Sequence, residues 1–172
     1  GKLIVEEFAP STAGSSHFRK LLNDLKTKKG FIPDVVYVDY INICISTRKN
    51  VTNANSYTII KYIAEELRGI AVDFDVPVIT ATQTNRGGYS SSDLSLEDTA
   101  ESFGLPATAD FMFSISQDED MKAMGQVLFK QLKNRFRDVE KDRKFAMGVQ
   151  KSKMRFLELE PSAQRMLNND VE

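Results

Sequence analysis

Two polar side chains follow short apolar segments in an arrangement that suits phosphate chemistry. Asp39 comes directly after the apolar residues 35–38, and Gln83 comes after the largely apolar residues 78–82. Such runs predict strands of a parallel sheet, and ligands of open α/β sheets bind at the carboxyl ends of these strands. A carboxylate there can hold Mg²⁺ through water, and a neutral amide can sense a γ-phosphate. The alternatives are that Asp39 caps a turn and that Gln83 is an ordinary polar residue at a strand end.

Lys133 and Arg135 form a second candidate group. They lie two residues apart in the segment VLFKQLKNRF, so on a strand both side chains would point to one face. Two cations on one face, near a chain turn, could reach a phosphate on a neighbouring subunit. The alternative is an exposed strand face without a ligand.

The elements that must position these residues alternate between strands and helices. Helical periodicity over residues 59–74 separates the two apolar runs, which predicts a parallel α/β unit with a right-handed crossover. The other predicted elements are a strand over 3–8, a helix capped by Ser15 and Ser16 and ended by Gly30, loops over 44–56 and 84–96, a short helix over 96–103, a strand over 111–115, a turn or short helix over 116–125, and antiparallel strands over 127–136, 145–150 and 155–159.

Composition excludes several classes of protein. The 172 residues suffice for one domain, and no apolar run approaches the roughly 20 residues of a membrane helix. With too short an apolar run for a secretory signal, the chain is expected to be cytoplasmic and unattached to membranes. Cys44 and His17 are the only residues of their types, so an internal disulfide, a His/Cys metal cluster and a Ser-His-Asp triad are not expected.

Charge is unevenly distributed, although the formal net charge is only −1. Residues 93–120 contain eight acidic side chains and no basic one, whereas residues 126–156 contain ten basic and three acidic side chains. The basic segment is either a solvated face or a surface available for phosphates.

The segments together resemble the DnaB-type replicative DNA helicases, and among them most those of T-even-like bacteriophages. VVYVDYINIC resembles the Walker B strand of that family, VPVITATQTNR its next motif, LEDTAESFGLPATADFMFSI the segment that follows, and LKNRF its trans-acting finger strand. The order and spacing match over about residues 2–160. The resemblance implies a partial RecA-like α/β core, with a mainly parallel sheet flanked by helices and antiparallel strands at the C-terminal end. Residues 161–172 are expected to be a disordered tail.

By that resemblance, Asp39 coordinates Mg²⁺ through water and Gln83 couples the nucleotide state to the DNA loops. Lys133 and Arg135 would reach the γ-phosphate of ATP bound by the adjacent subunit of a hexameric ring. The single-stranded DNA contacts would be Arg48, Lys49, Asn50, Arg86, Gly87, Glu101, Ser102 and Gly104. Some relatives have an arginine where this chain has Ala100.

The phosphate-binding loop and the catalytic glutamate of the family precede the part that this chain resembles. Gly1-Lys2 is not such a loop, because no glycine precedes it at the required spacing and Leu3 replaces the Ser or Thr that holds Mg²⁺. ATP and Mg²⁺ are therefore expected as cofactors of the complete helicase, and the fragment alone is expected to bind neither and to be inactive. Primase and other replisome proteins are the expected partners. A gap, an exposed sheet edge or a changed strand pairing is expected where the phosphate-loop strand is missing.

Two other interpretations remain open. Another RecA-like ATPase, such as a recombinase or a clock-type hexamer, would share Asp39 and the parallel sheet, but the Lys-Asn-Arg strand and the loop after Gln83 favour the helicase. The hypothesis from a different class is a non-enzymatic α/β module that binds nucleic acid or protein through its basic segment.

Overall fold

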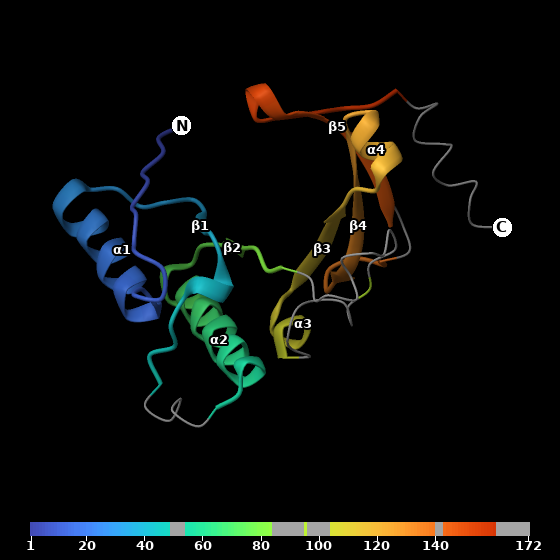
Figure 1. The fold of residues 1–172 in the computed structure, drawn as a ribbon. Helices are drawn as coiled ribbons and strands as arrows, with labels where there is room; N and C mark the ends of the chain where they lie inside the picture. The colour runs from blue at the N-terminus through green and yellow to red at the C-terminus, as the bar shows by residue number, and fades with distance from the viewer. Residues whose placement is uncertain (49–53, 84–94, 96–103, 140–142, 161–172) are drawn as a thin grey trace. The chain divides into compact units, whose positions relative to one another are not determined.

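The computed structural model describes residues 1–48, 54–83, 95, 104–139 and 143–160, which belong to two compact units (Figure 1). The first unit contains the described residues up to Gln83 together with Gly104–Ala109, and the second contains Ser95 and those from Asp110 onward. The two units are described separately. The predicted helix over 96–103, most of the loop over 84–96 and the tail over 161–172 lie outside the described residues.

The first helix of the first unit, α1 (Ser15–Lys29), is flanked by a glycine at each end. Its N-cap is Gly14, whose backbone N–H donates to Nδ1 of His17 at 3.3 Å. The prediction that Ser15 and Ser16 cap the helix is therefore wrong, because Ser15 is already the first helical residue. The helix ends as predicted at Gly30, which adopts φ 60°, a left-handed conformation that costs glycine little.

The long helix α2 (Ser56–Phe74) confirms the predicted periodicity. Asn55 caps it, since its side chain accepts a hydrogen bond from the Thr58 N–H at 2.9 Å. The buried residues recur at helical spacing and form the core of the unit: Ile60, Ile63, Ala64, Leu67 and Ile70.

The parallel sheet consists, in the described residues, of β1 (Val36–Val38) and β2 (Val78–Thr80). Both strands are shorter than the apolar runs predicted, β1 by one residue at its start and β2 by two residues at its end. After β1 the chain enters the 3-10 helix η1 (Ile41–Ile43). Tyr37 and Ile79 are partners across the sheet and remain 68% and 45% exposed. These two side chains leave one face of the sheet exposed in the first unit, whereas the expected consequence of a missing phosphate-loop strand stays a prediction.

The predicted strand over residues 3–8 is wrong. No element is assigned to this segment, and Leu3 and Val5 are 81% and 79% exposed. Apolar side chains favour a strand only where a neighbouring strand pairs with the backbone and a core covers one face. In the described residues nothing pairs with residues 3–8 as a ladder.

The second unit confirms the predicted antiparallel strands. The sheet has the order β3 (Phe111–Ser116), β4 (Gln126–Asn134), β5 (Lys144–Gln150) and β6 (Arg155–Leu157). Two short helical segments connect its strands, α4 (Glu119–Ala123) before β4 and the 3-10 helix η4 (Lys151–Lys153) before β6.

The antiparallel sheet has two different faces, because side chains alternate along each strand. Met121 of α4 packs on Leu128 and Ala146, and together they form a small core. Phe129 points from the next position of β4, and its ring contacts those of Phe145 and Phe156 at centroid distances of 5.1 and 5.5 Å. Among the described helices, none combines the length and apolar character needed to cross a membrane.

Candidate functional site

Asp39 and Gln83 lie at the same edge of the parallel sheet, as predicted. Val38 is the register partner of Thr80, so the chain leaves both strands at their shared carboxyl edge. Beyond the strands, the Ile41 N–H donates to the Ala81 carbonyl at 3.2 Å.

Side chains extend this connection beyond the backbone. The amide Nε2 of Gln83 donates to the phenol oxygen of Tyr40 at 3.3 Å, and the Thr82 hydroxyl donates to Oδ1 of Asn42 at 3.0 Å. Gln83 is therefore tied to the residue directly after Asp39.

The Asp39 carboxylate is exposed, and no described residue forms a hydrogen bond or an ion pair with it. Across the described ranges no three His, Cys, Asp or Glu side chains form a cluster that could hold a metal ion. A single accessible carboxylate at the carboxyl edge of a parallel sheet suits Mg²⁺ that keeps most of its water and takes other ligands from phosphates. The donor set therefore fits the predicted metal.

The two predicted trans-acting cations lie at the end of β4 in the second unit. Lys133 is in the strand, opposite Met112, whereas Arg135 follows the last strand residue, Asn134. Arg135 forms an ion pair with Asp110 at 2.9 Å, and its backbone N–H donates to the Asp110 carbonyl at 3.0 Å. Asp110 therefore fixes both the backbone and the side chain at this position.

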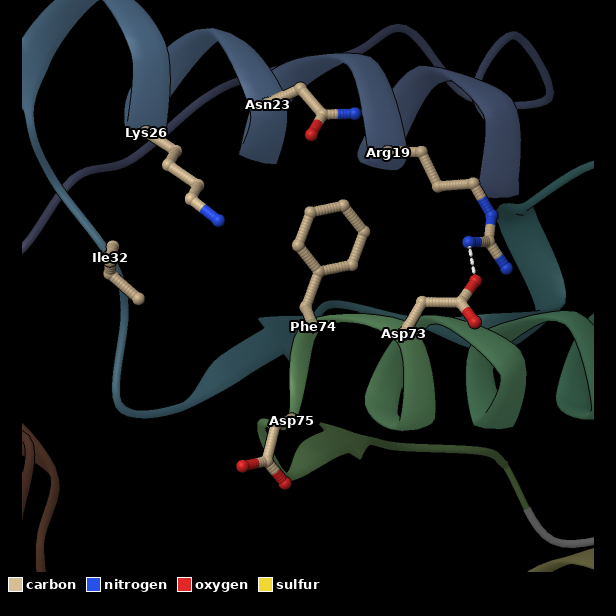
Figure 2. A pocket seen from close by; sticks show the side chains of 7 residues that line it. All are labelled: Arg19, Asn23, Lys26, Ile32, Asp73, Phe74 and Asp75. Carbon is tan, nitrogen blue, oxygen red and sulfur yellow. Dashed lines mark hydrogen bonds and ion pairs between the residues drawn. The ribbon is translucent and has the colours of Figure 1, made fainter.

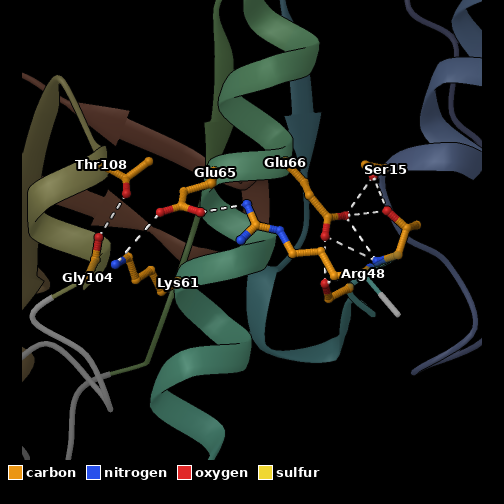
Figure 3. Close-up of polar contacts among 9 residues, drawn as sticks. Ser15, Arg48, Lys61, Glu65, Glu66, Gly104 and Thr108 are labelled. Atoms are coloured by element: carbon orange, nitrogen blue, oxygen red, sulfur yellow. Dashed lines mark hydrogen bonds and ion pairs between the residues drawn. The ribbon is translucent and has the colours of Figure 1, made fainter. Parts of the chain in front are cut away.

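Arg48, a predicted DNA contact, is held against α2. Its guanidinium forms an ion pair with Glu65 at 2.6 Å (Figure 3). The guanidinium also lies over the ring of Tyr62, at 4.2 Å from the centroid. Lys61 approaches the other oxygen of Glu65 at 3.9 Å. A phosphate that binds Arg48 must therefore compete with Glu65.

Glu66, one residue further along α2, accepts hydrogen bonds from the start of α1 and from the segment that leads to Arg48 (Figure 3). The hydroxyls of Ser15 and Ser46 donate at 2.6 Å each, and the Thr47 hydroxyl donates at 2.9 Å. Partial burial raises the pKa of Glu66, but the hydrogen bonds from these three residues outweigh burial and lower the pKa below its ordinary value of 4.5.

The second candidate DNA segment also ends on α2. Gly104 begins the short helix α3 (Gly104–Thr108). Its carbonyl accepts from the Thr108 hydroxyl at 2.9 Å, and the Thr108 carbonyl accepts from Arg68 of α2 at 2.7 Å. One described end of each predicted DNA segment is thus attached to α2, through Glu65, Glu66 and Arg68.

Most of the predicted DNA contacts lie outside the described residues, and their roles stay predictions: Lys49, Asn50, Arg86, Gly87, Glu101 and Ser102.

The residues that sequence reasoning missed are those that hold the predicted ones: Tyr40, Glu65, Glu66 and Asp110. Each acts through contacts between segments far apart in the chain, and charged residues on a helix are usually a solvated face. Only the position of Glu65 and Glu66 on the polar flank of the periodic helix gave any signal.

A cavity of about 330 Å³ lies between α1 and the end of α2 (Figure 2). Arg19 of α1 pairs with Asp73 of α2 at its rim, and Phe74 points into the space between the helices. None of its lining residues belongs to the predicted sites.

Known proteins resemble this chain in sequence over nearly its whole length. Residues 10–159 match the family described as DnaB-like helicase C terminal domain. The chain is 45% identical over 171 residues to the DnaB-like replicative helicase of Enterobacteria phage T4, which covers 99% of the chain but 36% of the relative's length.

Solved structures support the fold. One described as an ATPase domain matches with a TM-score of 0.69 at 20% identity, over 86% of this chain and 52% of that one. A DnaB-like replicative helicase, solved in a study of its interactions with primase, matches with a TM-score of 0.68 at 21% identity, over 86% of this chain and 36% of that one. The fold is thus that of RecA-like helicase ATPase domains, and the chain belongs to the DnaB-like helicase C-terminal domain family.

Proposed function

We propose that this chain is part of a ring-forming replicative DNA helicase that couples ATP hydrolysis to movement along single-stranded DNA and to duplex unwinding. The observation that supports this most directly is the position of Asp39 and Gln83 at one edge of β1 and β2 in a chain of the DnaB-like family. Residues 1–160 would form the C-terminal portion of its RecA-like ATPase domain. The Lys-Asn-Arg segment at the end of β4 favours a helicase over other RecA-like ATPases.

In this proposal ATP and Mg²⁺ belong to the complete helicase. Asp39 would hold the ion through water, since its carboxylate is exposed and has no partner among the described residues. The ion, when bound, neutralises charge on the phosphates. Gln83 exchanges the phenol of Tyr40 for a phosphate oxygen. Gln83 directly precedes the segment that begins at residue 84. A change in nucleotide state would therefore shift the position from which that segment leaves the sheet edge.

Lys133 and Arg135 act on ATP bound by the neighbouring subunit of a hexamer. Asp110 binds both the side chain and the backbone of Arg135, so the guanidinium would be oriented before the neighbour's phosphate competes with Asp110 for it. Cations supplied in this way stabilise the charge that develops on the transferred phosphoryl group.

Single-stranded DNA would contact two segments, each attached to α2 at one end. Arg48, Lys49 and Asn50 belong to the first, and Arg86, Gly87, Glu101, Ser102 and Gly104 belong to the second. Arg48 and Thr108 are both attached to this helix. A phosphate-binding surface of this kind gives affinity that falls as salt rises.

Partners and location are proposed from membership in this family. Primase and other replisome proteins are the proposed partners, since one solved relative was studied for its interactions with primase. A phage-encoded helicase would act in the cytoplasm of the host. The fragment alone is proposed to be inactive as an ATPase, and a rate above background that Asp39→Ala abolishes would contradict this.

The test of the proposed function is a graft. This chain replaces the matching 171 residues of the phage T4 relative, and ATP hydrolysis and duplex unwinding are measured with and without single-stranded DNA. We expect hydrolysis that single-stranded DNA stimulates and unwinding that requires ATP. A graft that assembles but neither hydrolyses ATP nor binds single-stranded DNA would overturn the proposal and favour a non-enzymatic α/β module.

A further inference from the structure

The carboxylate of Glu66 joins three parts of the first unit that are distant in sequence. It lies on α2 and accepts from Ser15 at the start of α1 and from Ser46 and Thr47 in the segment that leads to Arg48 (Figure 3). The backbone N–H of Thr47 also donates to both of its oxygens, at 3.1 and 3.2 Å. The contact therefore fixes backbone as well as side chains.

The donors match the chemistry of an ionised carboxylate. Such a group only accepts, with about four lone-pair sites on two oxygens. Four donor groups surround Glu66: three hydroxyls and one backbone N–H. A glutamine would present an NH₂ donor to some of these donors, so a neutral amide of the same shape cannot reproduce the arrangement.

A second set of contacts binds the same segment to the residues directly before α1. The Ile45 N–H donates to the Ala13 carbonyl at 2.9 Å, and Gly14 and Ile45 form a parallel bridge. A Cβ at position 14 would overlap the Ile45 carbonyl oxygen, so this close approach requires glycine. Residues 45–47 are thus held between the start of α1 and the carboxylate of Glu66.

We propose that Glu66 is a positioning residue for single-stranded DNA, because it fixes the backbone at Thr47 and so determines where Arg48 is presented. The inference rests on the proposed DNA contacts of the Arg48 segment. It assigns the adjacent acids opposite roles: Glu66 favours DNA binding by fixing the segment, whereas Glu65 opposes it by competing for Arg48.

These roles predict effects of opposite sign. Glu65→Gln and Glu66→Gln each remove one negative charge from the same helix, so general electrostatics would strengthen DNA binding in both. We expect Glu65→Gln to raise the affinity for single-stranded DNA about two- to threefold, because Arg48 loses an exposed ion pair. We expect Glu66→Gln to lower it about five- to tenfold, because hydrogen bonds to a charged acceptor are lost.

The experiment measures the dissociation constant of fluorescein-labelled oligo(dT) for the grafted helicase by anisotropy, at two salt concentrations. Glu66→Asp retains both acceptor oxygens and should bind within about threefold of the unsubstituted graft. Ser46→Ala removes a donor from the other side of the contact and should weaken binding. Because both changes act on one contact, the double variant Ser46→Ala/Glu66→Gln should bind no more weakly than Glu66→Gln alone.

The outcomes separate this inference from the proposed function. An unsubstituted graft that does not bind oligo(dT) overturns the proposed DNA contacts. Binding by the unsubstituted graft together with equal or tighter binding by Glu66→Gln overturns the positioning role alone, as does fully additive loss in the double variant. If Glu66→Gln does not fold, as thermal unfolding would reveal, Ser46→Ala decides: unchanged affinity contradicts the role, and a loss supports it.

Discussion

The carboxylates of Asp39 and Glu66 belong to the same unit but have opposite surroundings. Asp39 is exposed at the edge of the parallel sheet and has no partner among the described residues. Glu66 accepts from three hydroxyls and a backbone N–H. A carboxylate whose acceptor sites are filled by its own protein stabilises a conformation, whereas one left open can take ligands from outside. The difference is consistent with the roles proposed above, for Asp39 in the reaction and for Glu66 in the shape of the segment beside it.

The largest effect is expected when the exposed carboxylate of Asp39 is removed. In the grafted helicase Asp39→Asn should lower the rate of ATP hydrolysis about 100-fold, because it removes the charge that holds the hydrated ion. Asp34→Asn is the matched control, since Asp34 precedes β1 and Asp39 follows it. It should change the rate less than about twofold. Steady-state hydrolysis over a range of Mg²⁺ concentrations measures both, and equal losses in the two variants would remove the special role of Asp39.

A smaller loss is expected when the support of a trans-acting cation is removed. Asp110→Asn abolishes the ion pair with Arg135 but keeps the backbone contact between the two residues. Maximal hydrolysis by the grafted ring should fall about three- to tenfold, because Arg135 must then be ordered during the reaction. If Arg135→Ala alone and the double variant show the same rate, Asp110 acts through Arg135. Independent losses would show a separate role.

The hydrogen-bonded carboxylate of Glu66 should contribute to the stability of the folded chain, whereas the exposed carboxylate of Asp39 should not. Glu66→Gln should lower the free energy of unfolding of the 172-residue chain by about 1 kcal/mol, a value reduced because the group is partly solvated. Asp39→Asn should change it by less than about 0.5 kcal/mol. Urea denaturation followed by circular dichroism measures both. A larger loss for Asp39→Asn would reverse the comparison.

Acidification should produce the smallest effect and should act through Glu66. Its hydrogen bonds hold the pKa in the folded state below the ordinary value of 4.5. The stabilisation is therefore complete above the unfolded-state pKa and is lost as pH falls through the lower folded-state pKa. The difference in unfolding free energy between the unsubstituted chain and Glu66→Gln should be constant from about pH 7 to about pH 5 and should narrow below it. A difference that widens on acidification would contradict this.

Local pattern was sufficient for much of the fold. The 3.6-residue period of α2 and the alternating segments that became β4 to β6 were recognised because the apolar positions of each follow the period of that element. The segment over 3–8 failed because an apolar run does not reveal whether a strand will pair with it. The N-cap moved from serine to Gly14 because the close approach of Ile45 required a residue without a side chain.

The candidate site, like the fold, was predictable only where it depends on local sequence patterns. Asp39 and Gln83 could be placed together because parallel strands end at a common edge. The ion pair of Arg48 with Glu65 and that of Arg135 with Asp110 could not, because each joins residues from different elements. Pairing of this kind depends on tertiary packing, which no local pattern contains.

Residues 40–47 are fastened at both ends, at Tyr40 by Gln83 and at Thr47 by Glu66. Between these ends the backbone of the segment is also bound at Ile41, Ile43 and Ile45, by Ala81, Ser11 and Ala13 respectively. Cys44 lies in its middle, and its thiol donates to the Tyr40 carbonyl at 3.5 Å while burial raises its pKa. Because this is the chain's single cysteine, the rate of its reaction with a thiol reagent would report the accessibility of this segment without any engineered label.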